Sequence, residues 1–243
     1  MSSAQTAKEF MAALAAYGTP ERAANTVWFF KAYPGGYSEG DQFLGATVPN
    51  TRLVCKEFKD LALSEIKKLL YSPIHDFRLG AVILLVNQYK KADSKQRDAI
   101  FDVYLKAVYD SKVNNWDIVD SSAGYILGPH EERGDRRLLF KLAKSDNLWQ
   151  KRVGIMGAFY YLYNGDASTT LELAEILVND KYDLIQKAVG WQLREVGKRV
   201  DRQLLLAFLD KHAATMPRTT LRYAIEHLPV ERRAHYMGLK NQK

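Results

Sequence analysis

The chain of 243 residues contains a single cysteine, Cys55, and no cluster of cysteines and histidines with the spacing of metal ligands. One cysteine cannot form an internal disulfide, the cross-link that commonly stabilises small secreted domains. The sequence also lacks a run of roughly 18 uncharged residues, the length that a membrane-spanning helix needs, and no basic segment followed by an apolar one stands at its N-terminus. We therefore expect a cytoplasmic protein without a structural zinc, a membrane segment or a secretion signal.

The sequence is equally poor in motifs of the common enzyme classes. The histidines show neither the HExxH spacing of zinc hydrolases nor a partner serine or cysteine in a nucleophile motif. The one glycine-rich stretch, residues 33–40, lacks the GKS or GKT ending and the flanking buried strand of a nucleotide-phosphate loop. We interpret this stretch as a surface turn, and we expect no metal and no nucleotide cofactor.

Acidic residues are in the minority, because the sequence contains 28 Asp and Glu but 35 Lys and Arg. The net charge is therefore +7. Residues 1–180 carry 22 basic and 22 acidic residues, whereas residues 181–243 carry 13 and 6. A basic surface raises the local concentration of polyanions, so nucleic acid is the first candidate partner and anionic lipid the second. The alternative is a solvated helix face without a partner.

Apolar residues recur at helical spacing through almost the whole chain, and alternating strand patterns are nearly absent. The long apolar segments superimpose as one repeated element when five positions are aligned. These positions are Arg78, Trp116, Arg152, Lys187 and Arg222, at steps of 38, 36, 35 and 35 residues. This period is typical of two-helix solenoid repeats.

The repeat predicts an all-α fold, a right-handed α-solenoid of stacked helix pairs with a concave basic face. The segments near 96–110, 134–144, 168–179 and 201–212 are amphipathic and provide the first helix of each pair. Residues 1–32 have weaker repeat character and are expected to form an N-terminal helical cap with some contact to the ligand. The hydrophobic content of 47% suffices for one core, so we expect one domain over residues 1–243.

Aligned positions of successive second helices are expected to face the same side of the stack. This places Trp116, Arg152 and Lys187 in a row, with Asp120 and Trp191 four residues beyond the first and the third of them. Residues four apart share a helix face, so Trp116 and Asp120 project together. Two indoles and a carboxylate would then converge on one face.

Each of these residues also has an ordinary structural interpretation. A tryptophan in a helix is more often part of the core than of a ligand site, which applies to Trp116 and Trp191. Asp120 is costly to bury unpaired, and its structural role would be a salt bridge to Arg152. Arg152 could equally brace adjacent repeats, as could Arg78.

At these residues the sequence resembles a known family, the bacterial AlkD-type alkylpurine DNA glycosylases, which are built from HEAT-like repeats. The resemblance covers almost the whole chain. The segments that show the resemblance are YSEGDQFLGATVPNTR at 37–52, NNWDIVD at 114–120, NLWQKR at 147–152, IQKAVGWQLREVGK at 185–198 and MPRTTLRYAIEHL at 216–228. The resemblance implies that Trp116 and Trp191 flank the damaged nucleotide, that Asp120 is the catalytic carboxylate and that Arg152 holds the DNA backbone.

The activity that this resemblance implies is base excision repair, in which cationic N3- and N7-alkylated purines are released from duplex DNA without a base-reading pocket. No lysine stands beside Asp120 in a way that favours a Schiff base, so we expect a monofunctional enzyme that leaves an abasic site. We expect it to act as a monomer. Phosphate contacts are assigned to four basic residues, Lys187, Arg194, Lys198 and Arg222.

Two other functions stay open at the level of the sequence. One is a non-catalytic HEAT-like protein that binds unusual or branched DNA, because repeat families can keep a groove and lose its chemistry. Retention of Trp116, Asp120 and Arg152 argues against it. The other is a HEAT-like scaffold that binds proteins, which would have little use for a carboxylate between two tryptophans.

Overall fold

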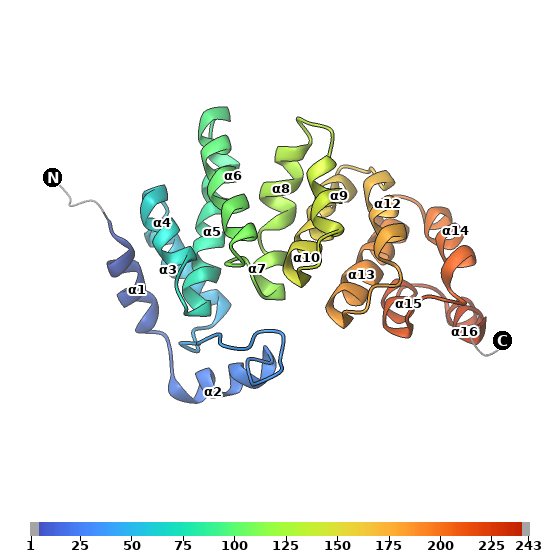
Figure 1. Cartoon of the computed structure of the whole chain (residues 1–243), viewed down its shortest axis with the longest axis horizontal. Helices are drawn as coiled ribbons and strands as arrows, with labels where there is room; N and C mark the ends of the chain where they lie inside the picture. Colours follow the sequence, from blue (N-terminus) through green and yellow to red (C-terminus); the bar gives the residue numbers. More distant parts are fainter. Residues whose placement is uncertain (1–4, 240–243) are drawn as a thin grey trace. The chain divides into compact units, whose positions relative to one another are not determined.

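In a computed structural model that describes residues 5–239, the chain is all-helical (Figure 1). These residues form sixteen helices, and the only extended pairing among them is an isolated parallel bridge between Gln42 and Ile74. The predicted all-α class is therefore confirmed. The chain divides into two compact units, Met1–Ile126 and Leu127–Lys243, which are described one at a time.

Unit 1 is organised around one long buried helix. Its helices are α1 (Ala7–Ala15), α2 (Pro20–Phe29), α3 (Val48–Glu57), α4 (Leu63–Leu70), α5 (His75–Lys91), α6 (Ser94–Tyr109), α7 (Trp116–Asp120) and the start of α8 (Ala123–Glu131). Helix α5 packs against α3, α4, α6 and α7, and its residues 75–86 are all buried. A helix that is apolar on all sides is stable only in such a position. Gly80 permits the close approach of α1, because a Cβ atom there would lie 2.7 Å from the Phe10 ring.

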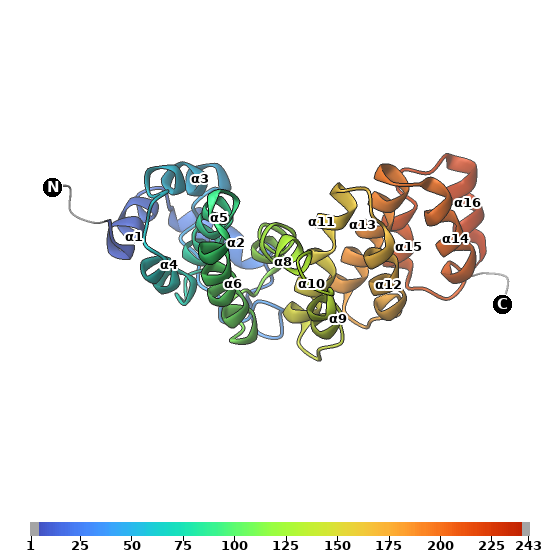
Figure 2. The ribbon, with the colours of Figure 1, turned by 90° about the horizontal axis from the view of Figure 1, so that it is seen from above.

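Unit 2 is a stack of shorter helix pairs. Its helices are the rest of α8, then α9 (Arg137–Ala143), α10 (Leu148–Gly157), α11 (Phe159–Tyr163), α12 (Ser168–Leu177), α13 (Asp183–Arg199), α14 (Arg202–His212), α15 (Arg218–Ala224) and α16 (Val230–Gly238). Helix α9 packs on α10, α12 on α13, and α13 on α10, α14 and α15. Within this unit, α9 and α12 lie in one layer and α13 and α15 in the other (Figure 2).

The predicted repeat corresponds to the observed helices. The five aligned residues each fall in a helix, in α5, α7, α10, α13 and α15, and all but Arg222 lie in its first half. The four segments predicted as first helices coincide with α6, α9, α12 and α14. The hand of the solenoid and its concave basic face stay predictions. Within residues 5–239, no helix combines the length and the apolar run that crossing a membrane requires.

Candidate active site

The short helix α7 carries Trp116 at its first position and Asp120 at its last, one turn apart. Both side chains are half-buried, while Ile118 and Val119 between them point into the core. The helix begins at a sharp bend, because the N-cap residue Asn115 has φ 86° and its side-chain oxygen accepts a hydrogen bond from the Trp116 amide. Trp116 and Asp120 therefore share a face, as the sequence spacing predicts.

Helix α7 is anchored by the segment that precedes α3. The side-chain amide of Asn115 donates a 2.7 Å hydrogen bond to the Ser38 hydroxyl, and both groups are buried. Ser38 lies inside the stretch 33–40, which the sequence analysis interpreted as a surface turn. Gly35 and Gly40 do adopt the left-handed backbone of tight turns, with φ +79° and +87°. The middle of the stretch is nevertheless part of the interior and contacts the helix that bears the candidate site.

Four charged side chains, which we call the buried ion cluster, connect this segment to α5 and α7. His75 Nε2 lies 2.9 Å from an Asp117 carboxylate oxygen, and His75 Nδ1 lies 3.5 Å from Asp41. Asp41 also accepts a 2.7 Å hydrogen bond from Arg78, whose other terminal nitrogen donates to the Ser72 carbonyl at 3.0 Å. All four carry little solvent exposure, so their charges are compensated chiefly by one another.

The cluster changes the ionisation of its members. Burial acts to lower the pKa of His75, but the Asp117 carboxylate and the nearby Asp41 carboxylate outweigh it and raise this pKa to about 9. Burial acts to raise the pKa of Asp41, but the contacts with His75 and Arg78 hold it below its usual range. At neutral pH the imidazolium of His75 thus bridges two carboxylates, one of them on α7.

Trp116 lies against aromatic side chains at the end of α2. Its ring centroid is 5.2 Å from that of Phe30 and 5.7 Å from that of Phe29. Phe30 in turn packs on His75 and on Phe43. Phe29 is 65% exposed and Trp28 beside it 72%, so the aromatic surface that begins at Trp116 continues into solvent along α2. Exposed aromatic faces of this kind can stack on nucleobases.

Asp120 lies in the wall of a cavity of about 210 Å³ within unit 1. The lining residues are Arg52, Ile83, Val86, Asn87, Lys90, Asp120, Ser121 and Tyr125. Lys90 Nζ lies 4.6 Å from the centroid of the Tyr125 ring, a cation–π contact. From the sequence, no lysine was expected beside Asp120. Lys90 reaches the cavity from the end of α5, thirty residues earlier in the chain. The residues that neighbour Asp120 in the sequence therefore do not reveal it.

In unit 2, Arg152 is buried and its guanidinium donates a hydrogen bond of 2.5 Å to the carbonyl of Leu184. Leu184 is the second residue of α13, so Arg152 joins α10 to the next helix pair. This contact is the inter-repeat brace that the sequence analysis had kept as an alternative role. Trp191 on α13 is half-buried and meets the Phe159 ring edge-on, with centroids 4.7 Å apart.

The four basic residues predicted to contact phosphates differ in their availability. Lys198 and Arg222 are exposed. Lys187 forms an ion pair with Asp183 at 3.2 Å. Arg194 is engaged by Glu195 at 3.2 Å and by Glu226. Two arginines that the sequence analysis did not single out, Arg202 beside Lys198 and Arg233 beside Arg222, line the hollows at these positions.

A stack of helix pairs that presents a carboxylate, an indole and uncompensated cations has the features of a helical-repeat protein that acts on a charged polymer. Among the described residues, no group of three or more His, Cys, Asp and Glu is placed to hold a metal ion.

The family model of DNA alkylation repair enzymes matches residues 10–228, so the chain belongs to this family. A solved structure, "Predicted DNA alkylation repair enzyme from Enterococcus faecalis", superimposes with a TM-score of 0.67. It has 16% sequence identity, and the match covers 88% of this chain and 97% of that one. This likeness shows the fold. No curated protein sequence matches the chain. Membership makes DNA alkylation repair the function and DNA the partner.

Proposed function

We propose that the chain is a monofunctional DNA glycosylase of the AlkD type, which excises cationic N3- and N7-alkylated purines from duplex DNA in base excision repair. The observation that carries this proposal is the placement of Asp120 in the wall of an open cavity, one helical turn from Trp116. Membership of the DNA alkylation repair family supports it. We further propose a cytoplasmic monomer, as the sequence predicts.

The reaction does not require a strong general acid, because a purine alkylated at N3 or N7 carries a positive charge and is already a good leaving group. The bond between C1′ and the purine nitrogen breaks, its electron pair returns to the purine, and the base leaves neutral. Positive charge moves to the sugar, where the Asp120 carboxylate stabilises it. Water then forms the new bond to C1′, and its proton passes to Asp120 and on to solvent. The products are a free alkylpurine, an abasic site and one proton.

The aromatic residues supply selectivity in this proposal. The face of an indole attracts a cation, so Trp116 favours a charged alkylated nucleotide over a neutral one. The contacts of Trp116 with Phe29 and Phe30 hold its ring on the surface of unit 1. The resemblance assigns the matching role in unit 2 to Trp191, and to Arg152 a contact with the DNA backbone. The brace from Arg152 to Leu184 would hold its guanidinium in place for such a contact.

Release of 7-methylguanine from methylated duplex DNA tests the proposal. Asp120→Asn keeps the size of the side chain and removes its charge, and we expect release to fall at least about 10²-fold, the scale for loss of one group that stabilises transition-state charge. Binding to duplex DNA should persist. Ser121→Ala, at a neighbouring position in the same cavity, serves as the control and should retain activity.

Each outcome separates the candidate functions. Full activity of Asp120→Asn would remove Asp120 from the mechanism. Absence of release from the unaltered chain, with duplex binding intact, would favour the non-catalytic DNA-binding protein. Absence of both would favour the protein-binding scaffold.

A further inference from the structure

The cavity that contains Asp120 is more basic than acidic. Arg52 reaches it from α3 and Lys90 from α5, and both residues are exposed. Among residues 5–239, neither of them forms an ion pair, in contrast to Lys187 and Arg194 of unit 2. The lining therefore carries two cations against the single carboxylate of Asp120, an excess of one positive charge. An anionic ligand would balance this excess.

The chemistry at Asp120 identifies this anion. If the carboxylate faces C1′ of the damaged nucleotide, the nearest negative charges of the substrate are the phosphodiesters on the same deoxyribose. We infer that the cavity is a sugar–phosphate subsite, in which Arg52 and Lys90 bind a phosphodiester of the nucleotide whose C1′ faces Asp120. This inference rests on the proposed function. It assigns phosphate binding to unit 1, whereas the contacts with the DNA backbone predicted from the sequence, at Arg152 and at four basic residues between 187 and 222, all lie in unit 2.

Arg52 and Lys90 suit this role for different reasons. A guanidinium offers planar, paired donors to two phosphate oxygens, and Asn87 adds a neutral polar group in the same cavity. Lys90 lies over the Tyr125 ring, which fixes the position of its ammonium at the rim.

Phosphate binding differs from a second possible role of Lys90. A lysine that cleaves the abasic strand must attack C1′ as a neutral amine and form a Schiff base. In the structure Lys90 Nζ instead contacts the face of the Tyr125 ring, at 4.6 Å from its centroid. Phosphate binding needs only the charged amine. The inference therefore agrees with a monofunctional enzyme even though a lysine lines the cavity.

The subsite would recognise the product as well as the substrate. Hydrolysis removes the purine and leaves both phosphodiesters of the sugar in place, so Arg52 and Lys90 keep their ligand after the base has left. A duplex with a tetrahydrofuran analogue of the abasic site cannot be cleaved by a glycosylase and carries the same phosphates. It is the appropriate probe because its binding does not require catalysis.

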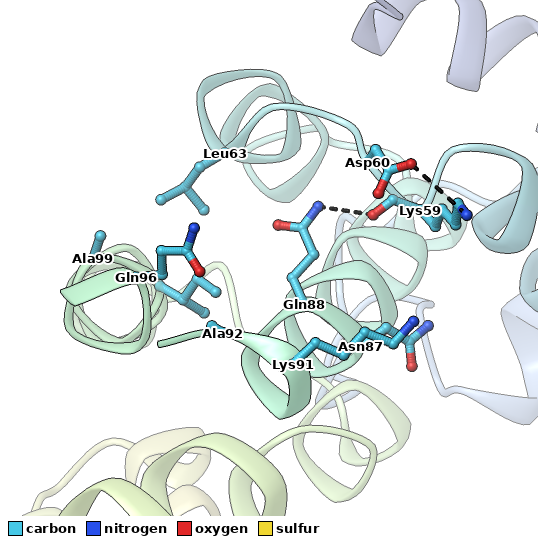
Figure 3. A pocket seen from close by; sticks show the side chains of 10 residues that line it. Lys59, Asp60, Leu63, Asn87, Gln88, Lys91, Ala92, Gln96 and Ala99 are labelled. Atoms are coloured by element: carbon cyan, nitrogen blue, oxygen red, sulfur yellow. Dashed lines mark hydrogen bonds and ion pairs between the residues drawn. The ribbon is translucent and has the colours of Figure 1, made fainter. Parts of the chain in front are cut away.

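The chain offers a matched control on the same helix. Lys91 follows Lys90 but lines a different hollow. This is the cavity of about 400 Å³ between α5, α6 and the segment that joins α3 to α4, where the Gln88 side-chain amide donates a hydrogen bond to the Lys59 carbonyl (Figure 3). Lys90→Gln and Lys91→Gln remove the same charge from adjacent positions. We expect Lys90→Gln and Arg52→Gln each to weaken binding of the abasic duplex about tenfold, and Lys91→Gln to weaken it less than twofold.

Neutral linkages locate the phosphate that is bound. A methylphosphonate replaces one phosphodiester at a time around the tetrahydrofuran residue. For the unaltered chain we expect about a tenfold loss of affinity at a linkage adjoining that residue, and for Lys90→Gln no further loss there. Borohydride treatment with natural abasic DNA should trap no covalent adduct.

Three results would overturn the inference. They are equal weakening by Lys90→Gln and Lys91→Gln, the absence of any sensitive linkage beside the abasic residue, and a borohydride adduct that Lys90→Gln abolishes. The failure of the proposed function looks different, because it appears as absence of 7-methylguanine release from the unaltered chain.

Discussion

The two units hold their candidate site residues in different ways. In unit 1, α7 is tied down by charges, since Asp117 meets the His75 imidazolium at 2.9 Å inside the buried ion cluster. In unit 2, the corresponding helices are tied by side chains that donate to backbone carbonyls, Arg152 to Leu184 and Gln192 to Ile155. A charged cluster depends on pH and fails when one member is lost, whereas separate hydrogen bonds fail one at a time. Unit 1 should therefore be the more fragile support.

The largest effect on stability is expected from removal of the central cation of the buried ion cluster. His75→Leu removes the positive charge between Asp41 and Asp117 and leaves two carboxylates in a buried site. We expect the free energy of unfolding to fall by about 3–5 kcal/mol, the scale for a buried charge that loses its partner. Denaturant unfolding followed by circular dichroism measures it.

A second substitution tests whether charge is the cause of this loss. Asp41→Asn together with His75→Gln removes opposite charges and should cost less than the sum of the single changes. Additive costs would mean that the cluster is held by packing and not by charge.

The next effect is the dependence of stability on pH that His75 of unit 1 supplies above pH 6.5. The folded-state pKa of His75, about 9, lies above its unfolded value of 6.5. The stabilisation is thus complete below pH 6.5 and is lost as the pH rises through 9, by at most about 3 kcal/mol. The charged groups that act on His75 are Asp117, Asp41 and Arg78.

Unfolding measured between pH 6 and 9.5 checks this prediction. The unaltered chain should lose stability over that range, and the His75→Gln variant should show a flatter profile. Parallel profiles of the two proteins would show that His75 is not the titrating group.

A smaller effect is expected from the brace of unit 2. Arg152→Ala leaves the Leu184 carbonyl without its donor and should lower the free energy of unfolding by about 1–3 kcal/mol. The pH profile of stability should keep its shape, because the cluster of unit 1 is untouched. If the loss exceeds that of His75→Leu, the order of fragility of the two supports is reversed.

The same contrast shows what could be read from the sequence and what could not. Helix pairs and their period were predicted because amphipathic spacing is local. The buried ion cluster joins Asp41 to Asp117 across 76 residues, and Lys90 meets the cavity of Asp120 through packing of α5 beside α7. No local pattern contains these contacts. One signal was present in the sequence. His75, Asp76 and Arg78 are charged or ionisable residues at the start of a long apolar segment, and such residues need hydrogen-bond or ion-pair partners when they are buried.

Net charge was the weakest guide, because it does not reveal which cations are already paired. The excess over residues 181–243 drew attention to unit 2, yet Lys187 and Arg194 there lie in ion pairs, whereas Arg52 and Lys90 of unit 1 form none with residues 5–239. The charge available to a ligand is what remains after internal pairs are subtracted. An internal pair must be broken, or its acid displaced, before its cation can replace a counterion on DNA.

The smallest expected effect concerns two lysines of α13 and sharpens this point. Lys198 is exposed and unpaired among the described residues, and its change to Gln should reduce the slope of log affinity against log salt by about one for duplex DNA. Lys187 is partly neutralised by Asp183, so Lys187→Gln should reduce the slope by less. Asp183→Asn frees Lys187 and should increase the slope. Equal slopes for all three variants would show that surface pairing does not govern which lysines of unit 2 contact DNA.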